Sequence, residues 1–368
     1  MKTVFLTRRF FPEIGGVERH SLEVAKRLIQ HGHEVKVVSE FTPTLNNNKK
    51  INYQSSSKSA KLHQCKEQPV KSSYSDHFEI KNIEVFKFNL GSSEFFKKFK
   101  IWWYLLRNIK VILQADIVHC HDVFIWYLPF RFLLPWKKVY VTFHGYENFP
   151  LKKRQIFLHR LSQVLSNGNI AVGRFIEKWY GTKSDFITYG GVDRSGVLPK
   201  KNALGAKEIK ILFLGRCEAD TGVFEYVKIL KELRKSKIKF QLQVCGDGGL
   251  AKEFKHYGKL NGFVKSPEDF IDWSDVVFTS SYLSILESMA RRRPVVSVYA
   301  NSLKEDYLKM SKFKNYIMIT DSEEDAVGYI KKTINGQSKK LVEEGYVWAK
   351  SQTWEKVEEL YIKLWKIK

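Results

Sequence analysis

Two kinds of apolar pattern alternate along the chain. Short runs rich in β-branched residues predict buried strands, and they occupy residues 3–6, 34–38, 82–88, 116–121, 139–144, 170–172, 186–189, 209–214 and 240–245. Between them, apolar side chains recur every three to four residues, for example over residues 17–28 and 223–230, which predicts amphipathic helices. Alternating strands and helices are typical of doubly wound parallel sheets, so the predicted fold class is α/β. The length of 368 residues favours two such domains.

The stretch from residue 275 to residue 298, DVVFTSSYLSILESMARRRPVVSV, predicts a strand, a loop, a helix and a second strand. Ser284 lies near the predicted helix start, where unpaired backbone N–H groups and the helix dipole can hold a phosphate. Glu287 follows closely enough to accept hydrogen bonds from a sugar hydroxyl. The stretch therefore predicts a nucleotide site in an α/β domain.

Glycine turns follow other predicted strands, as Gly15-Gly16 and as Gly246-Asp247-Gly248-Gly249. At the carboxyl edge of a doubly wound sheet, glycines let the backbone approach a ligand, although a Gly-Gly pair alone is more often a simple turn. Arg216 follows the strand at residues 209–214, and its permanently charged guanidinium suits a phosphate. His144 ends another strand, where α/β proteins place their sites, but a lone histidine is more often structural.

The chain contains, in this order, the segments FFPEIGGVERHSLEVAKRLIQHGHEV, TFHG, YGGVD, the Gly215-Arg216 pair with Thr221-Gly222, and LESMARRRPVVS. Together these motifs resemble the retaining glycosyltransferases of family 4, which have the two-domain GT-B fold. The resemblance implies two Rossmann-like domains facing a central cleft: residues 1–193 on the acceptor side, a linker at 194–207, and residues 208–350 binding a nucleotide-diphosphate sugar. It further implies that a last helix, residues 351–368, returns towards the first domain.

The resemblance also implies roles for individual residues. Glu287 would hold the donor ribose, the helix start and the glycine pair would hold the diphosphate, and His144 would lie beside the transferred sugar. The implied catalytic residues are His144, Arg216 and Glu287. The implied donor-binding residues are Gly15, Gly16, Arg216, Thr221, Gly246, Phe263, Val264, Ser284, Ile285, Leu286 and Glu287.

Three positions depart from the family pattern. Thr221 stands where a phosphate-binding lysine is usual, Thr279 where a carboxylate is usual, and Gly190 where asparagine is usual. The implied activity is transfer of a sugar to an acceptor hydroxyl with retention, without an essential metal or cofactor. The departures keep two alternatives open: a non-catalytic nucleotide- or sugar-binding relative, and a nucleotide-sugar epimerase or hydrolase on the same fold.

The net charge of +23 implies an anionic partner: nucleotide phosphates, an anionic lipid surface or nucleic acid. No nucleic-acid motif is present, so nucleic acid is the least favoured of these. Helical spacing over residues 95–113 allows two interpretations, a core helix with its basic face in water or an interfacial helix on anionic lipid. The second would fit a lipid-linked or polysaccharide acceptor. The residues 42–77, rich in Asn, Lys, Ser and Gln, predict a long solvated loop or an acceptor-side lid.

The four cysteines are far apart, which argues against a disulfide framework or a zinc site and favours a reducing compartment. His119, His121 and His144 likewise fit no zinc spacing. The N-terminal apolar run is too short for a signal peptide, and prolines interrupt the apolar residues 124–136. We therefore expect a cytoplasmic protein, whose positive charge would allow peripheral binding to the inner face of the cell membrane.

Overall fold

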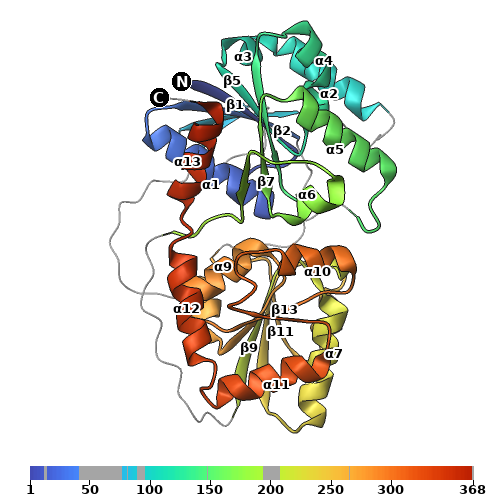
Figure 1. Cartoon of the computed structure of the whole chain (residues 1–368), viewed down its shortest axis with the longest axis vertical. Helices are drawn as coiled ribbons and strands as arrows, with labels where there is room; N and C mark the ends of the chain where they lie inside the picture. The colour runs from blue at the N-terminus through green and yellow to red at the C-terminus, as the bar shows by residue number, and fades with distance from the viewer. Residues whose placement is uncertain are drawn as a thin grey trace, which may run out of the picture.

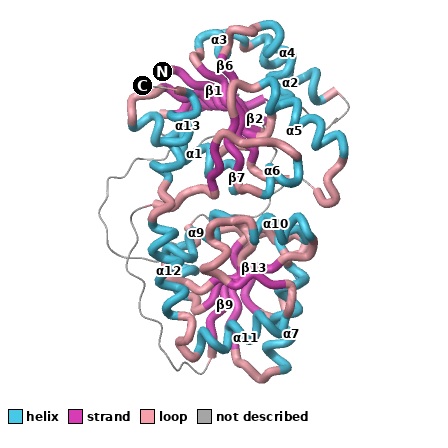
Figure 2. Tube along the Cα trace, in the orientation of Figure 1, coloured by secondary structure: helices cyan, strands magenta, loops and turns pink. Residues whose placement is uncertain are grey.

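A computed structural model describes residues 1–11, 15–40, 77–80, 82–88, 96–146, 148–193, 208–264 and 266–366. It contains two α/β domains stacked along the long axis of the molecule (Figure 1). In each, a sheet forms the centre and helices lie on both faces (Figure 2). The predicted linker at residues 194–207 lies outside the described residues, as does the predicted loop at 42–77 except for its last residue.

The first domain is built on an eight-stranded sheet with the order β3-β4-β2-β1-β5-β6-β7-β8. All neighbouring strands in it are parallel except β3, which is antiparallel to β4. The strands are β1 (Lys2–Thr7), β2 (Glu34–Glu40), β3 (His77–Ile80), β4 (Ile83–Phe88), β5 (Ile117–His121), β6 (Lys138–Phe143), β7 (Asn169–Val172) and β8 (Phe186–Thr188).

Side chains alternate between the two faces of this sheet, so the domain has two apolar layers. Phe5 of β1 points into a layer with Leu28 and Trp365. Its neighbours Val4 and Leu6 point into the opposite layer. The first layer is closed by α1 (Gly16–Gln30) and α13 (Trp354–Trp365), which pack against each other. The second layer is covered by α2 (Lys97–Arg107), α3 (Ile109–Gln114), α4 (Phe124–Leu133), α5 (Lys153–Leu165) and α6 (Phe175–Tyr180).

The second domain contains a six-stranded, fully parallel sheet with the order β11-β10-β9-β12-β13-β14. Its strands are β9 (Ile209–Leu214), β10 (Phe240–Cys245), β11 (Gly258–Gly262), β12 (Val276–Phe278), β13 (Val295–Val298) and β14 (Met318–Thr320). Its helices are α7 (Val223–Lys235), α8 (Glu268–Trp273), α9 (Tyr282–Ala290), α10 (Ser302–Lys309), α11 (Glu323–Ile334) and α12 (Lys339–Lys350), and short 3₁₀ turns η1 (Ala219–Thr221) and η2 (Ala251–Phe254) join them.

The carboxyl ends of the two sheets turn towards each other. Gly173 and Gly190, which follow β7 and β8, lie so close to Tyr282 and Leu283 of α9 that a Cβ atom on either glycine would clash. Asp306 of α10 accepts a hydrogen bond from the indole N–H of Trp179 on α6 at 2.8 Å. The two domains are thus in direct contact at the edges where α/β proteins bind ligands.

The region predicted as one helix over residues 95–113 is broken at Asn108 into α2 and α3. Its buried side chains are Ile101, Leu105 and Ile112. Of the apolar positions with the predicted spacing, Phe95 lies outside the described residues, Trp102 and Ile109 pack against the core, and Phe99, Leu106 and Leu113 are exposed. The two helices therefore cover the sheet, as the first interpretation expected, but only part of that spacing faces the core. Among the residues that the structure describes, no helix is long and apolar enough to span a membrane.

Candidate functional site

The start of α9 offers main-chain N–H groups to a ligand. Ser281 lies between β12 and α9. It precedes the helix in an extended conformation, and its side chain makes no capping hydrogen bond. The hydroxyl of Tyr307 accepts the N–H of Tyr282 at 3.1 Å. Ser284, Ile285 and Leu286 follow, and the Ile285 and Leu286 side chains are buried beneath the helix. A helix start without a side-chain cap from its preceding residue, with its positive dipole end, suits a phosphate.

Glu287 lies in the second turn of α9 and forms an ion pair with Arg19 of α1, across the domain interface. The Glu287 side chain is only 13% exposed and the Arg19 side chain 27%. Burial raises the pKa of the Glu287 carboxyl to about 7, and the charge of Arg19 opposes that rise. The structure therefore brings a carboxylate of the second domain against the glycine-rich start of α1, because Gly15 caps that helix and Gly16 begins it.

Arg216 follows β9 and is 68% exposed, and its guanidinium donates to Asp220 at 2.6 Å. The charges of Arg216 and Asp220 act on the pKa of Tyr146, which lies just beyond His144 in the first domain. They also act on Lys304 of α10. The Lys304 ammonium is buried, donates to the Ser280 carbonyl at 2.7 Å, and has a pKa lowered to about 8 chiefly by burial. Two cations from separate elements thus lie near the β12–α9 loop.

Thr221 does not point its hydroxyl towards a ligand. Its Oγ1 lies 2.6 Å from the carbonyl oxygen of Arg216 and 2.7 Å from that of Glu218, so its single hydrogen is donated to the main chain, and the side chain is buried. Thr279 is also buried, and its hydroxyl has no hydrogen-bond partner among the described residues. At both threonine positions that depart from the family pattern, the side chain therefore lies within the protein.

The remaining donor candidates of the second domain lie around β10 and β11. The N–H of Gly246 donates to the carbonyl of Gly262 at 2.8 Å, and a Cβ atom on Gly246 would lie 1.7 Å from the Gly215 carbonyl oxygen. Only glycine fits there. Phe263 is half exposed, whereas Val264 packs on the apolar cluster beneath the sheet.

His144 follows β6 and is half-buried, and its main-chain N–H donates to the Asp122 carboxylate at 2.8 Å. Its Nε2 lies 2.9 Å from Nδ1 of His121. Burial lowers the pKa of both imidazoles well below the usual value, so both are neutral at neutral pH. Among the described residues, no group of three or more His, Cys, Asp or Glu side chains is placed to hold a metal ion.

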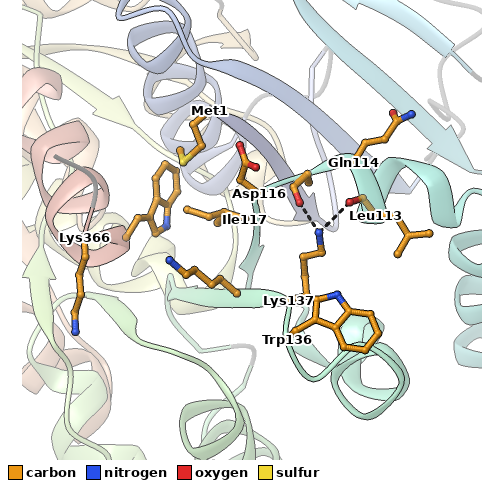
Figure 3. A pocket seen from close by; sticks show the side chains of 11 residues that line it. Met1, Leu113, Gln114, Asp116, Ile117, Trp136, Lys137 and Lys366 are labelled. Carbon is orange, nitrogen blue, oxygen red and sulfur yellow. Dashed lines mark hydrogen bonds between the residues drawn. The ribbon is translucent and has the colours of Figure 1, made fainter.

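A cavity of about 450 Å³ lies at the opposite edge of the first sheet, at the amino ends of β1, β5 and β6 (Figure 3). Two of its polar side chains have partners: the Lys137 ammonium donates to the carbonyls of Leu113 and Ala115, and Asp116 accepts the main-chain N–H of Lys2. This cavity is separate from the strand ends that carry Arg216, Glu287 and His144.

Comparison with family models decides the identity. Residues 14–189 match the model of Glycosyltransferase Family 4, and residues 208–333 match the model of Glycosyl transferases group 1. The chain belongs to glycosyltransferase family 4. A family 4 glycosyltransferase transfers a sugar, and both domains of this one are represented in the matches. No curated protein sequence matches the chain.

Solved structures that are similar to this family 4 glycosyltransferase share its GT-B fold. HepE from Anabaena, in complex with UDP and glucose, is similar with a TM-score of 0.71 and 13% identity over 100% of this chain and 99% of that one. Sucrose-phosphate synthase from Thermosynechococcus elongatus has a TM-score of 0.70 and 12% identity over 100% and 98%. A glycosyltransferase from Rickettsia africae has a TM-score of 0.67 and 17% identity, with both chains fully covered.

The structure adds residues to the site that sequence reasoning did not single out. Arg19 lies inside the GGVERH motif, so the motif contained a signal for it, but its partner Glu287 is in the other domain. Lys304 belongs to no motif and is recognised only through the folding of α10 against the β12–α9 loop. Binding of the donor by the predicted residues stays a prediction.

Proposed function

We propose that this family 4 glycosyltransferase moves a sugar, with retention, from a nucleotide-diphosphate sugar to an acceptor hydroxyl, and that it needs no metal. The observation that carries the proposal is the uncapped start of α9 with Glu287 one turn further on. A diphosphate at the helix start would place the ribose hydroxyls beside the Glu287 carboxylate. Arg216, at the end of β9, would then add a permanent positive charge.

In this proposal the main catalytic task is stabilisation of the leaving diphosphate. Helix dipole, main-chain N–H groups and the Arg216 guanidinium are fixed in place before reaction, and such preorganised groups are most effective for charge that develops in the transition state. The leaving phosphate would accept the proton of the attacking hydroxyl. His144 would contact the transferred sugar from the first domain.

Uridine donors are the first to test, because HepE was crystallised with UDP and with UDP-glucose. The experiment incubates the full chain with panels of uridine, guanosine and adenosine diphosphate sugars, with and without glycan and lipid-linked acceptors. Formation of a glycoside with the anomeric configuration of the donor, in the presence of a chelator, is the expected result. An inverted anomer or a strict requirement for a divalent ion would contradict the proposal.

The same assay separates the two alternatives. An epimerase or hydrolase would change the donor without an acceptor, and a non-catalytic relative would bind a donor but convert none. The buried positions of Thr221 and Thr279 are compatible with transfer in this proposal, because Arg216 and Lys304 supply positive charge near the same loop.

We also propose that the acceptor is reached at an anionic membrane surface on the cytoplasmic side. Helices α2, α4 and α5 are neighbours in the first domain (Figure 1). Each of them exposes large apolar side chains. These exposed side chains, here called the aromatic-basic face, are Phe99, Trp103, Leu106, Phe132, Leu133 and Phe157.

Exposed cations accompany this apolar surface on the same helices, at Lys100, Arg107, Lys153, Arg154 and Arg160. Burial and, to a smaller extent, the charge of Arg154 on α5 lower the pKa of Lys98 on α2, so the basic groups of these helices are close enough to interact. Apolar side chains mixed with cations match the chemistry of an anionic bilayer surface. A lipid-linked acceptor would be presented on that surface.

Flotation with phosphatidylserine vesicles tests this part of the proposal. The full chain is expected to float at low salt and to be released at high salt, and a Phe99→Ser, Trp103→Ser double variant to lose flotation. The matched control replaces two exposed apolar residues of the second domain, Phe224→Ser and Val347→Ser, and should float like the wild type. Equal flotation of the two double variants would refute the membrane assignment.

A further inference from the structure

A buried hydrogen-bond chain runs from the last helix to the histidines of the first domain. The indole N–H of Trp365 lies 3.0 Å from Nδ1 of His119, and Nε2 of His119 lies 2.7 Å from the Thr142 hydroxyl. Thr142 is 2.9 Å from the Tyr361 hydroxyl, which is 3.0 Å from Nε2 of His20. All five side chains are buried. We call this chain, from Trp365 to His20, the relay.

The protons of the relay have one consistent order. An indole nitrogen can only donate, so Nδ1 of His119 must accept and its Nε2 must carry the proton that goes to Thr142. The Thr142 hydroxyl has no other acceptor among the described residues than Tyr361, so it donates to Tyr361. Tyr361 then donates to Nε2 of His20. In the reverse order the Thr142 hydrogen would be buried without an acceptor.

Burial keeps these rings neutral, since it lowers the pKa of His20 to about 3 and that of His119 well below its usual value. A neutral His20 that accepts at Nε2 carries its proton on Nδ1. Its ring meets the His144 ring edge to face, with centroids 4.8 Å apart. The end of the relay is therefore packed directly against the strand-end histidine.

The contact of His144 with His121 determines which ring nitrogen of His144 carries the proton. His121 and His144 share one hydrogen bond between Nδ1 and Nε2, while Nε2 of His121 is buried without a partner in the part of the chain that the structure describes. If His144 were the donor, His121 would carry its proton on that buried Nε2, and a buried orphan N–H is rarer and costlier than an orphan acceptor. His121 is therefore the donor, and His144 is protonated on Nδ1.

We propose that His20, His121 and Tyr361 are positioning residues that hold His144 as a hydrogen-bond donor, through Nδ1–H, for an oxygen of the bound sugar. This inference rests on the proposed function for its ligand. In this tautomer the free ring nitrogen of His144 has no lone pair, so the residue binds a sugar oxygen and removes no proton from the acceptor hydroxyl. Helix α13, although it is last in the chain, thereby contributes to the site of the first domain.

The first test uses the full chain labelled with ¹⁵N-histidine and no substrate. Long-range ¹H–¹⁵N spectra distinguish the two neutral tautomers of each imidazole, and assignments come from single His→Gln variants. The expected result is Nε2–H for His119 and Nδ1–H for His20, His121 and His144. An Nε2–H tautomer at His144 or at His20 would overturn the inference, whatever the protein's activity.

The second test removes one hydroxyl. Tyr361→Phe keeps the ring but takes the donor from His20, and Tyr127→Phe is the matched control, because the Tyr127 hydroxyl is buried without a partner among the described residues. Tyr361→Phe is expected to shift the His20 and His144 nitrogen signals and to lower kcat about tenfold with little change in the donor KM. Tyr127→Phe should change neither. Unchanged signals and kcat in folded Tyr361→Phe would refute the positioning role, whereas absence of transfer by the wild type would count against the proposed function alone.

Discussion

The ionisation of Glu287 should make the stability of the protein depend on pH. Burial raises the pKa of this carboxyl from 4.5 to about 7 in the folded chain. The protonated carboxyl thus favours the folded state, and this contribution is complete below pH 4.5 and is lost as the pH rises through 7. A Glu287→Gln variant carries a neutral isostere and does not suffer that loss.

The size of the effect follows from the pKa difference. The side chain is only 13% exposed, so water screens it little. Each pKa unit corresponds to about 1.4 kcal/mol, so ionising Glu287 in the folded chain costs about 3 kcal/mol at pH 8. The Arg19 ion pair is already included in the value of about 7, because the charge of Arg19 lowers the pKa that burial raises.

Thermal unfolding of wild type and Glu287→Gln at pH 5 to 8.5 tests this reasoning. The variant should gain stability over the wild type as the pH rises, and the gain should level off above pH 7. Glu343→Gln is the control, because Glu343 is exposed and a hydrogen bond from Arg292 lowers its pKa below 4.5, so the stability difference between this variant and the wild type should stay constant from pH 5 to 8.5. A stability difference between Glu287→Gln and wild type that stays constant with pH would refute the account of this carboxyl.

Two further predictions concern local structure, each measured by thermal unfolding. Gly246→Ala should prevent folding of the second domain, because its Cβ would lie 1.7 Å from a carbonyl oxygen, whereas Gly328→Ala, in open space on α11, should stabilise by about 0.5–1 kcal/mol. A folded Gly246→Ala would contradict the close approach of the two loops. Thr221→Val should cost about 1–3 kcal/mol, because a main-chain carbonyl oxygen loses its buried donor. Thr333→Val, which removes a buried hydroxyl without a partner among the described residues, should be nearly neutral, and equal losses in the two valine variants would argue against the hydrogen-bonding role of Thr221.

The alternation of apolar runs was sufficient to predict most of the strands and the α/β class. β9 and β10 run over the same residues that the pattern predicted, because short β-branched runs between turns have few other ways to be buried. β11, with the sequence GKLNG, was missed because its residues carry no apolar alternation. It is a strand only because it pairs with β10.

The helix at residues 97–107 shows a different limit. Both Ile101 with Leu105 and Phe99 with Leu106 are apolar, and periodicity does not say which pair faces the sheet. In the structure Ile101 and Leu105 are buried, whereas Phe99 and Leu106 are exposed. Which pair is buried depends on tertiary contacts, which a local pattern does not contain.

The candidate site divides in the same way. Groups at strand ends, such as Arg216 and His144, could be located from the sequence because the sheet places them at one edge. The Arg19–Glu287 pair and the relay join residues hundreds of positions apart, as in the contact between His20 and Tyr361. These pairings depend on how the domains and the last helix pack. The sequence therefore did not predict which residues would be paired, even where a motif contained one partner.

If a nucleotide-diphosphate sugar binds at the start of α9, calorimetric titration of donor sugars at low salt should detect it. We expect at least one donor to bind the wild type, Glu287→Ala and Arg216→Ala each to weaken binding at least tenfold, and Arg292→Ala, which alters an exposed ion pair of the same domain, to leave it unchanged. Equal donor affinity in all four proteins, or no donor binding to the wild type, would contradict the account.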